Sequence, residues 1–159
     1  MPVRVQTEDF DVSRELAQLR GDNAAVGAVA AFVGTVRDVN DDARVASMTL
    51  EHYPGMTEKA LAAIVDEARS RWYIMDALVV HRVGALAPSD QIVLVGVTSA
   101  HRGEAFAACE FIVDYLKTRA PFWKQVEQTG KKAWIEAKAA DDALAERWSP
   151  PTPQREAAK

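Results

Sequence analysis

The residues of this chain that could do chemistry gather at the two ends of one predicted helix, within the stretch 101–124, HRGEAFAACEFIVDYLKTRAPFWK. Ser99 or Thr98 could cap its start. His101 and Arg102 follow, where the helix dipole is already positive, a placement that typically costs about 0.3–1 kcal/mol. A bound anion would remove this cost, because free N–H groups and cations would converge on it. The start of the helix is therefore a candidate phosphate or carboxylate site.

The other end of the helix carries lysines. Lys117 and Arg119 lie in the predicted last turn, Pro121 ends the helix, and Lys124 follows the aromatic pair 122–123. Cations near a helix C-terminus suit the dipole without any function, so solvated charges are the simpler interpretation of the spacing alone. Two lysines held in a partly dry pocket would instead provide a base or a nucleophile. The spacing leaves both interpretations open.

The elements that must position these residues form an α+β pattern. Within the helix, apolar residues recur at helical spacing and predict a core-facing stripe: Ala105, Ala108, Cys109, Ile112 and Leu116. The polar segment 39–44, VNDDAR, predicts a mobile loop, and 85–90, ALAPSD, predicts a turn. The predicted strands are 3–6, 25–33, 46–53, 77–83, 91–98, 122–127 and 132–137, and the predicted helices are 12–20, 57–72, 104–119 and 141–147.

Composition narrows the class of protein. The 159 residues fit one domain with a real core, and 48% hydrophobic and 26% charged residues are ordinary values for a soluble globular protein. A net charge of −4 argues against general nucleic-acid binding. Cys109 is the only cysteine, and we expect a buried core thiol. The histidines at 52, 81 and 101 show no metal-ligand spacing. No signal peptide or membrane-spanning apolar run stands out, so we expect a cytoplasmic protein that binds neither membrane nor nucleic acid.

Several segments closely resemble the large, catalytic subunit of molybdopterin synthase, the MoaE family. The matches run in order from about residue 3 to residue 148 and include long, compositionally unusual stretches. They are GAVAAFVGTVRD (27–38), LEHYPGMTEKAL (50–61), VGVTSAHR (95–102), YLKTRAPFWK (115–124) and WIEAK (134–138). The resemblance implies one α+β domain over residues 1–148, with an α/β-hammerhead-like core and a mostly antiparallel sheet. Residues 149–159, SPPTPQREAAK, lack core-forming side chains and predict a disordered tail.

The resemblance also implies an activity in molybdenum cofactor biosynthesis. Members of the family are sulfurtransferases that add two sulfurs to cyclic pyranopterin monophosphate and so make the dithiolene of molybdopterin. A small ubiquitin-like subunit donates the sulfur from a C-terminal Gly-Gly thiocarboxylate, and the assembly is a heterotetramer around a homodimer of the large subunit. The resemblance implies that this chain needs no cofactor and no metal of its own.

The resemblance assigns roles residue by residue. It implies catalysis by the two lysines, binding of the substrate's cyclic phosphate by cationic side chains, and a pocket wall of apolar ones. Arginine suits the phosphate because its planar fork makes paired hydrogen bonds. For His101, a capping or core histidine remains the alternative. The implied set is Lys117 and Lys124 for catalysis, Arg37, His101, Arg102 and Lys138 for substrate binding, and Phe32 and Val113 for the pocket wall.

Some positions depart from the family pattern. Lys138 stands where we expect an arginine that reaches the neighbouring subunit's pocket, and a lysine loses the bidentate fork. Glu127 comes one place later than the usual acidic residue, and Val126 occupies the usual position.

Two other functions stay open: a non-catalytic module that binds a ubiquitin-like tail, and an unrelated enzyme for a phosphorylated ligand. The retained cations argue against the first, and the lack of a metal or nucleophile motif argues against the second.

Overall fold

A four-stranded sheet forms the centre of the computed structural model, which describes residues 2–40, 43–128, 131–135 and 139–149. Its strand order is β1 (Val3–Gln6), β5 (Asp76–Arg82), β7 (Gln91–Ser99) and β2 (Ala28–Thr35). β1 runs parallel to β5, and the other two pairings are antiparallel. β2 is therefore an edge strand, and it leads toward Arg37.

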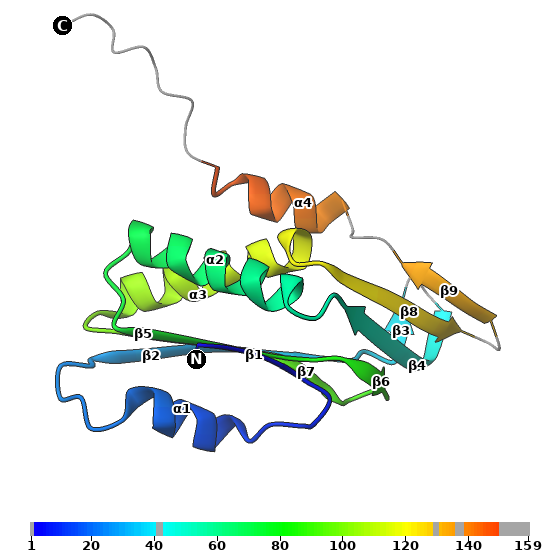
Figure 1. Ribbon diagram of the computed structural model, residues 1–159, viewed down its shortest axis with the longest axis horizontal. Helices are drawn as coiled ribbons and strands as arrows, with labels where there is room; N and C mark the ends of the chain where they lie inside the picture. Colours follow the sequence, from blue (N-terminus) through cyan, green and yellow to red (C-terminus); the bar gives the residue numbers. More distant parts are fainter. Residues whose placement is uncertain (1, 41–42, 129–130, 136–138, 150–159) are drawn as a thin grey trace, which may run out of the picture.

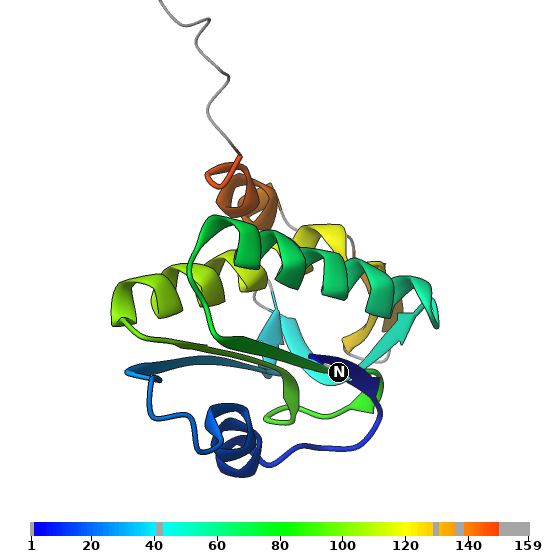
Figure 2. The ribbon, with the colours of Figure 1, turned by 60° about the vertical axis from the view of Figure 1, so that its left-hand side comes forward.

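Helices cover both faces of this first sheet (Figures 1 and 2). α1 (Val12–Arg20) lies on one face, and α2 (Met56–Arg71) and α3 (Arg102–Arg119) lie on the other. The central strands β5 and β7 are mostly apolar in their middle because both of their faces are buried. Leu78 and Val80 pack with Phe10 on the face that α1 covers. Val79 and Val95 belong to the larger cluster on the opposite face, under α2 and α3.

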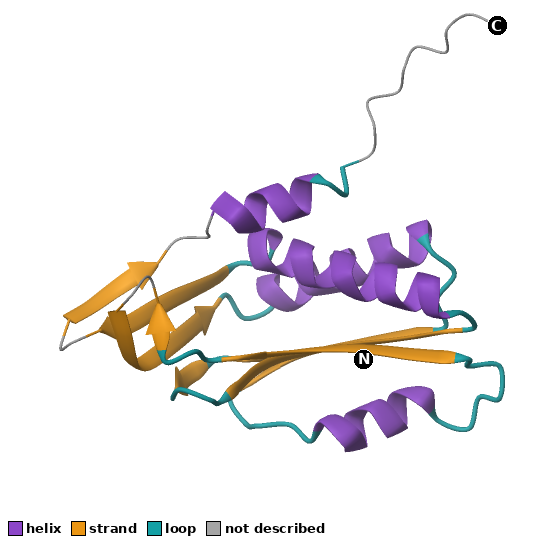
Figure 3. Ribbon diagram, turned by 180° about the vertical axis from the view of Figure 1, so that it is seen from behind, coloured by secondary structure: helices purple, strands orange, loops and turns teal. Residues whose placement is uncertain are grey.

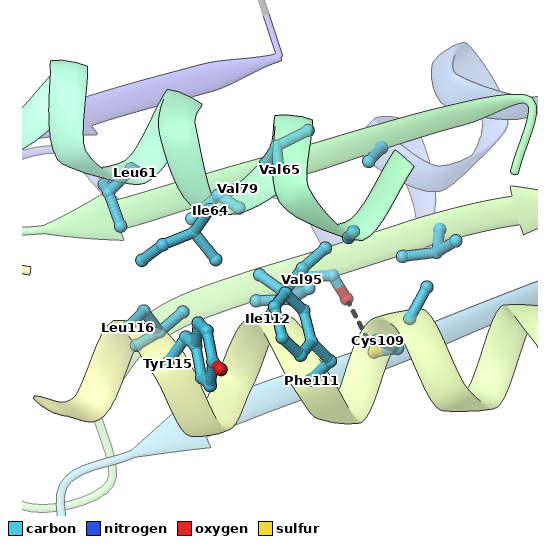
Figure 4. Packing of buried hydrophobic residues seen from close by; sticks show 14 of the residues in the cluster. Leu61, Ile64, Val65, Val79, Val95, Cys109, Phe111, Ile112, Tyr115 and Leu116 are labelled. Atoms are coloured by element: carbon cyan, nitrogen blue, oxygen red, sulfur yellow. Dashed lines mark hydrogen bonds between the residues drawn. The ribbon is translucent and has the colours of Figure 1, made fainter. Parts of the chain in front are cut away.

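The main core lies between this sheet and the two long helices (Figure 4). All residues of the predicted stripe on α3 are buried, so that prediction is confirmed. Phe111 and Tyr115, which the stripe did not include, are also buried and lie with their ring centroids 4.1 Å apart. Burial raises the pKa of the Cys109 thiol to about 12, and its Sγ donates to the carbonyl of Val95 at 3.8 Å. Cys109 is a core thiol, as predicted.

A second sheet lies beside the end of the first sheet at which α3 ends (Figures 1 and 3). It contains β3 (Val39–Asn40), β4 (Ala43–His52), β8 (Phe122–Gln128) and β9 (Lys131–Ile135), and β6 (Gly84–Leu86) pairs with β4. All its pairings are antiparallel. A smaller apolar cluster fills the junction between the two sheets: Val36, Met48, Leu50, Val83 and Leu86.

The last helix, α4 (Ala139–Glu146), packs on the outer side of α3 (Figure 1). Asp114 of α3 is 7% exposed and accepts hydrogen bonds from Arg147 at 2.8 Å and from the indole N–H of Trp148 at 2.6 Å. Charge-assisted bonds of this kind are stronger than neutral ones. They fasten the end of the described chain to the middle of α3.

The α+β class with mostly antiparallel pairing is confirmed, but two local predictions were wrong and a third was incomplete. The segment 39–44 contains β3 and the start of β4, which pair with each other, rather than a continuous loop. The segment 85–90 contains the predicted turn, at 88–89, but also part of β6, which long-range pairing with β4 stabilises. The N-cap of α3 is His101, because Thr98 and Ser99 are still in β7. Among the described residues, no helix is both long and apolar enough to cross a membrane.

Candidate active site

Lys117 stands exposed in the last turn of α3, and the chain changes direction immediately after it. Ala120 is extended, with φ −86° and ψ 133°, because the following Pro121 disfavours the helical conformation there. β8 then begins at Phe122. The segment with both candidate catalytic lysines therefore turns from a helix directly into a strand, as the proline predicted.

Lys124 lies on β8 opposite Leu50 of β4. Phe122 is two residues earlier, so its side chain leaves the same face of the strand. Phe122 packs against both apolar clusters, which places this face toward the interior. The side chain of the half-buried Lys124 thus leaves the inner face of β8, whereas the side chain of Lys117 is exposed at the surface of α3.

A buried histidine lies between these two segments. His81 of β5 is 5% exposed, and its ring stacks on Phe122 with centroids 3.8 Å apart and planes 19° apart. Its Nδ1 lies 2.8 Å from the carbonyl oxygen of Arg82. Burial, with smaller contributions from the charges of Lys117 and His52, lowers the pKa of His81 to about 4, against the opposite effect of the Arg82 carbonyl. At neutral pH the ring is uncharged and close to Lys117.

Thr57 joins the segment after β4 to the turn between α3 and β8. This fully buried side chain donates to the carbonyl of Pro121 at 3.0 Å and accepts from the N–H of Tyr53 at 3.1 Å. Next to it, His52 approaches Glu58 at 3.4 Å across the first turn of α2. The hydroxyl fixes the main chain midway between Lys117 and Lys124, and this limits their relative movement.

Arg37 lies at the same end of the molecule. It is exposed and directly follows Val36, whose N–H donates to Asp90 at 2.9 Å and whose side chain packs in the junction cluster with Leu50. Leu50 is the register partner of Lys124. The structure therefore places Arg37 on the side of the molecule that carries the lysines.

The two predicted pocket-wall residues, Phe32 and Val113, lie on β2 and α3. Both are partly buried and pack at the margin of the main core. Phe32 pairs in register with Val95 in the middle of the sheet. In the single chain these side chains are margin residues of the core. Val113 lies one helical turn before Lys117 on the same face of α3, whereas Phe32 lies on a different element from both lysines.

His101 and Arg102 lie at the opposite end of α3. The helix has 18 residues, which at 1.5 Å per residue separates its ends by roughly 27 Å. Both side chains are exposed, and His101 occupies the N-cap without a side-chain capping bond, so the capping and core alternatives were wrong. Within one chain, these residues do not meet Lys117. Lys138 lies outside the described residues.

The beginning of α3 is nevertheless firmly built. Ser99 is fully buried, and its hydroxyl donates to the carbonyl of Tyr73 at 2.8 Å. Gly27 donates its N–H to Ser99, and a Cβ at Gly27 would lie 2.2 Å from the carbonyl oxygen of Ala100. Only glycine fits this close approach of the two strand ends.

Comparison with known proteins identifies the family. The sequence model of the MoaE protein matches residues 5–119. The chain belongs to the MoaE family. The MoaE protein of molybdopterin biosynthesis from Burkholderia ambifaria superposes with a TM-score of 0.81 at 54% identity, over 94% of this chain and 98% of that one. This agreement extends the family match from sequence to fold.

Two further proteins that resemble this chain have names that state an activity. The molybdopterin synthase catalytic subunit of Ralstonia nicotianae is 62% identical over 147 residues, which is 92% of this chain and 83% of the relative. A molybdopterin synthase structure from Staphylococcus aureus superposes with a TM-score of 0.78 at 31% identity, over 83% of this chain and 95% of that one. Both similarities cover nearly the full length of the fold described above.

Sequence reasoning missed His81 and Thr57 as parts of this site. The signal for His81 was available, because a histidine interrupts the valine-rich segment 77–83, where every position was predicted to be strand. The signal for Thr57 was weaker, since threonine is common near the start of helices. Their importance became evident only from contacts with the turn at Pro121 and Phe122.

Proposed function

We propose that this protein is the catalytic subunit of a molybdopterin synthase. It transfers sulfur from the C-terminal thiocarboxylate of a small ubiquitin-like subunit to cyclic pyranopterin monophosphate, and the product is the dithiolene of molybdopterin. The observation that carries the proposal is the 62% identity, over 92% of this chain, to a molybdopterin synthase catalytic subunit. A cytoplasmic location stays a prediction from the sequence.

In this proposal Lys117 is the central catalytic residue. The thiocarboxylate gives up its sulfur to a substrate carbon, and water later hydrolyses the acyl intermediate to free the spent partner. Lys117 stabilises negative charge on the tetrahedral intermediates, transfers a proton, or is itself transiently acylated. Its exposure supports the proposal, because an incoming tail can reach it without rearrangement of the core. Lys124 is the second catalytic lysine, on the inner face of β8.

The phosphate of the substrate is bound by arginine and histidine side chains from two copies of the chain. Arg37 lies at the end of the molecule with the lysines, whereas His101 and Arg102 lie roughly 23 Å from Lys117 along α3. A substrate of pterin size cannot bridge that distance, so a second copy supplies His101 and Arg102 to each site. Lys138 would reach the same pocket. We therefore propose a homodimer that binds two small subunits.

A reconstituted turnover assay tests the function. Purified protein is mixed with cyclic pyranopterin monophosphate and a thiocarboxylated ubiquitin-like partner, and mass spectrometry follows the dithiolene product. Lys117→Ala should lower turnover by roughly 100-fold or more while partner binding persists, because the lysine acts on transition-state charge. Lys59→Ala, at an exposed lysine of α2, is the matched control and should turn over normally.

The alternatives give different results in the same experiment. A tight complex with the partner but no product from the wild-type protein would favour the non-catalytic binding module. Turnover of phosphorylated ligands without any partner, abolished by EDTA, would favour an unrelated enzyme for a phosphorylated ligand. Near-normal turnover by Lys117→Ala would contradict the role of that lysine even if the wild-type protein makes product.

A further inference from the structure

His81 is the one buried histidine among the described residues, and the proposed mechanism does not yet use it. An imidazole is costly to bury unless its nitrogens are hydrogen-bonded. On β5 its neighbours in the first sheet are Val5 and Val93, both apolar. A valine at position 81 would suit the same surroundings without this cost. The histidine therefore needs an explanation beyond the packing of the sheet.

The single hydrogen bond of the ring assigns its tautomer. A main-chain carbonyl can only accept, so Nδ1 must carry the proton that it donates to Arg82 at 2.8 Å. The neutral ring then has an unprotonated Nε2 with a free lone pair. Nε2 makes no hydrogen bond to the described residues, and no buried side-chain polar atom among them lacks a partner. Nε2 therefore reaches the small part of the ring that is open to solvent.

Charged groups from several elements act on this ring. They are Lys117 of α3 and His52 of β4. His52 is itself held by Glu58 of α2 at 3.4 Å. Lys124 leaves the face of β8 that carries Phe122, whose ring stacks on His81. A neutral acceptor in this position can bind an ammonium group without adding a further positive charge.

We propose that His81 is a positioning residue for Lys117, whose ammonium group donates to the unprotonated Nε2 when the partner's tail closes the site. This inference rests on the proposed sulfur transfer. The two groups are not hydrogen-bonded in the free chain, where Lys117 is exposed to water. Removal of water by the tail strengthens a hydrogen bond between a cation and a neutral acceptor. The stack on Phe122 keeps the ring from turning away.

Two substitutions separate the two nitrogens of the ring. His81→Asn keeps an amide N–H near Nδ1, which can still donate to Arg82, but leaves nothing at Nε2. His81→Gln extends one bond farther and can place its amide oxygen at Nε2. The proposal predicts that Asn lowers kcat by roughly tenfold or more, as expected for a lost positioning contact, with KM for the partner little changed. Gln should recover most of the rate. Equal losses in the two variants, or a loss confined to KM, would overturn it.

A measurement without turnover tests the same assignment in the wild-type protein. Ring ¹⁵N spectra at pH 7 should show His81 with a protonated Nδ1 and an unprotonated Nε2. In the complex with the unthiolated partner, Lys117→Ala should shift the Nε2 resonance, and Lys59→Ala should not. A protonated Nε2, or no difference between the two lysine variants, would overturn the inference. Failure of the wild-type protein to bind the partner or make product would instead contradict the proposed function.

Discussion

At its start, α3 presents His101 and Arg102 to solvent, whereas near its end Lys117 stands close to the buried ring of His81. Both ends are firmly anchored by a buried hydroxyl group, Ser99 at the start and Thr57 at the end. They differ in what surrounds the charges. The cations at the start have no ion-pair partner among the described residues, but the lysines at the end adjoin an apolar junction and an imidazole.

In the proposed function, this difference means that one chain holds two separate parts of a site. The end of α3 has features suited to chemistry, namely lysines, a neutral acceptor and a fixed turn. The start has features suited to anion binding, namely free helix N–H groups and two cationic or titratable side chains. Helix length keeps these parts apart in one chain, which is why the proposed function places the second part on a symmetry-related copy.

The largest expected effect comes from mixing two inactive variants. Lys117→Ala removes the chemical part of the site, and Arg102→Ala removes the anion-binding part from the other copy. If each site takes one part from each chain, a heterodimer of the two variants has one intact site and one doubly altered site. Random exchange between equal amounts should therefore restore about a quarter of wild-type turnover, because half the dimers are mixed and half their sites are intact.

The control for this mixing experiment is a pair of variants on the same part of the site. Lys117→Ala mixed with Lys124→Ala leaves every site of a heterodimer without one lysine, because both lysines of a site come from the same chain. Each site then takes its lysines from a single variant, so no turnover should return. Recovery in this control, or none in the first mixture, would contradict a site shared between copies.

The next largest effect is a pH dependence of the free energy of unfolding, and it comes from His81, the buried histidine near the end of α3. The unfolded His81 ring binds a proton below its ordinary pKa of 6.5, but the folded ring does so only near 4. The contribution of the neutral His81 ring to the free energy of unfolding is therefore fully present above pH 6.5 and is lost as the pH falls toward 4. At 1.36 kcal/mol per pKa unit the loss is roughly 3 kcal/mol. Urea unfolding at several pH values should show this loss in the wild-type protein beyond that in His81→Gln. Parallel curves for the two proteins would contradict a buried neutral imidazole.

Much of the fold could be predicted from the sequence because its signals are local. The stripe on α3 follows helical spacing, and Pro121 marks its end. The two short strands were missed for a physical reason. β6 is three residues long, and β3 only two, so pairing with distant or neighbouring segments of β4 stabilises them rather than their own sequence.

The candidate site was predictable in type but not in arrangement. Residue types pointed to lysine chemistry and anion binding, yet the separation of His101 from Lys117 follows from helix length and could have been calculated from the predicted helix. His81 could not have been placed in this way. β5 is buried on both faces, so alternation does not tell which face carries the histidine, and its stacking partner Phe122 is distant in sequence.

The smallest expected effect tests whether the turn at Pro121 is held by a hydrogen bond. Thr57→Val keeps the shape of the side chain but leaves the Pro121 carbonyl and the Tyr53 N–H without their partner. We expect a loss of about 1–3 kcal/mol in the free energy of unfolding. Turnover should also fall, because Lys117 and Lys124 flank the released turn.

Thr118→Val is the matched control for this last prediction. Its hydroxyl lies 3.4 Å and 3.5 Å from carbonyl oxygens of its own helix, which already have main-chain partners or water available. Urea unfolding should therefore give a change below about 0.5 kcal/mol, the usual range for substitutions away from such features. Equal losses for the two variants would show that a valine in place of threonine matters generally near this end of α3. A loss confined to Thr57→Val would show that the hydrogen bond from Thr57 to the Pro121 carbonyl, and not the end of α3 itself, holds the turn between the lysines in place.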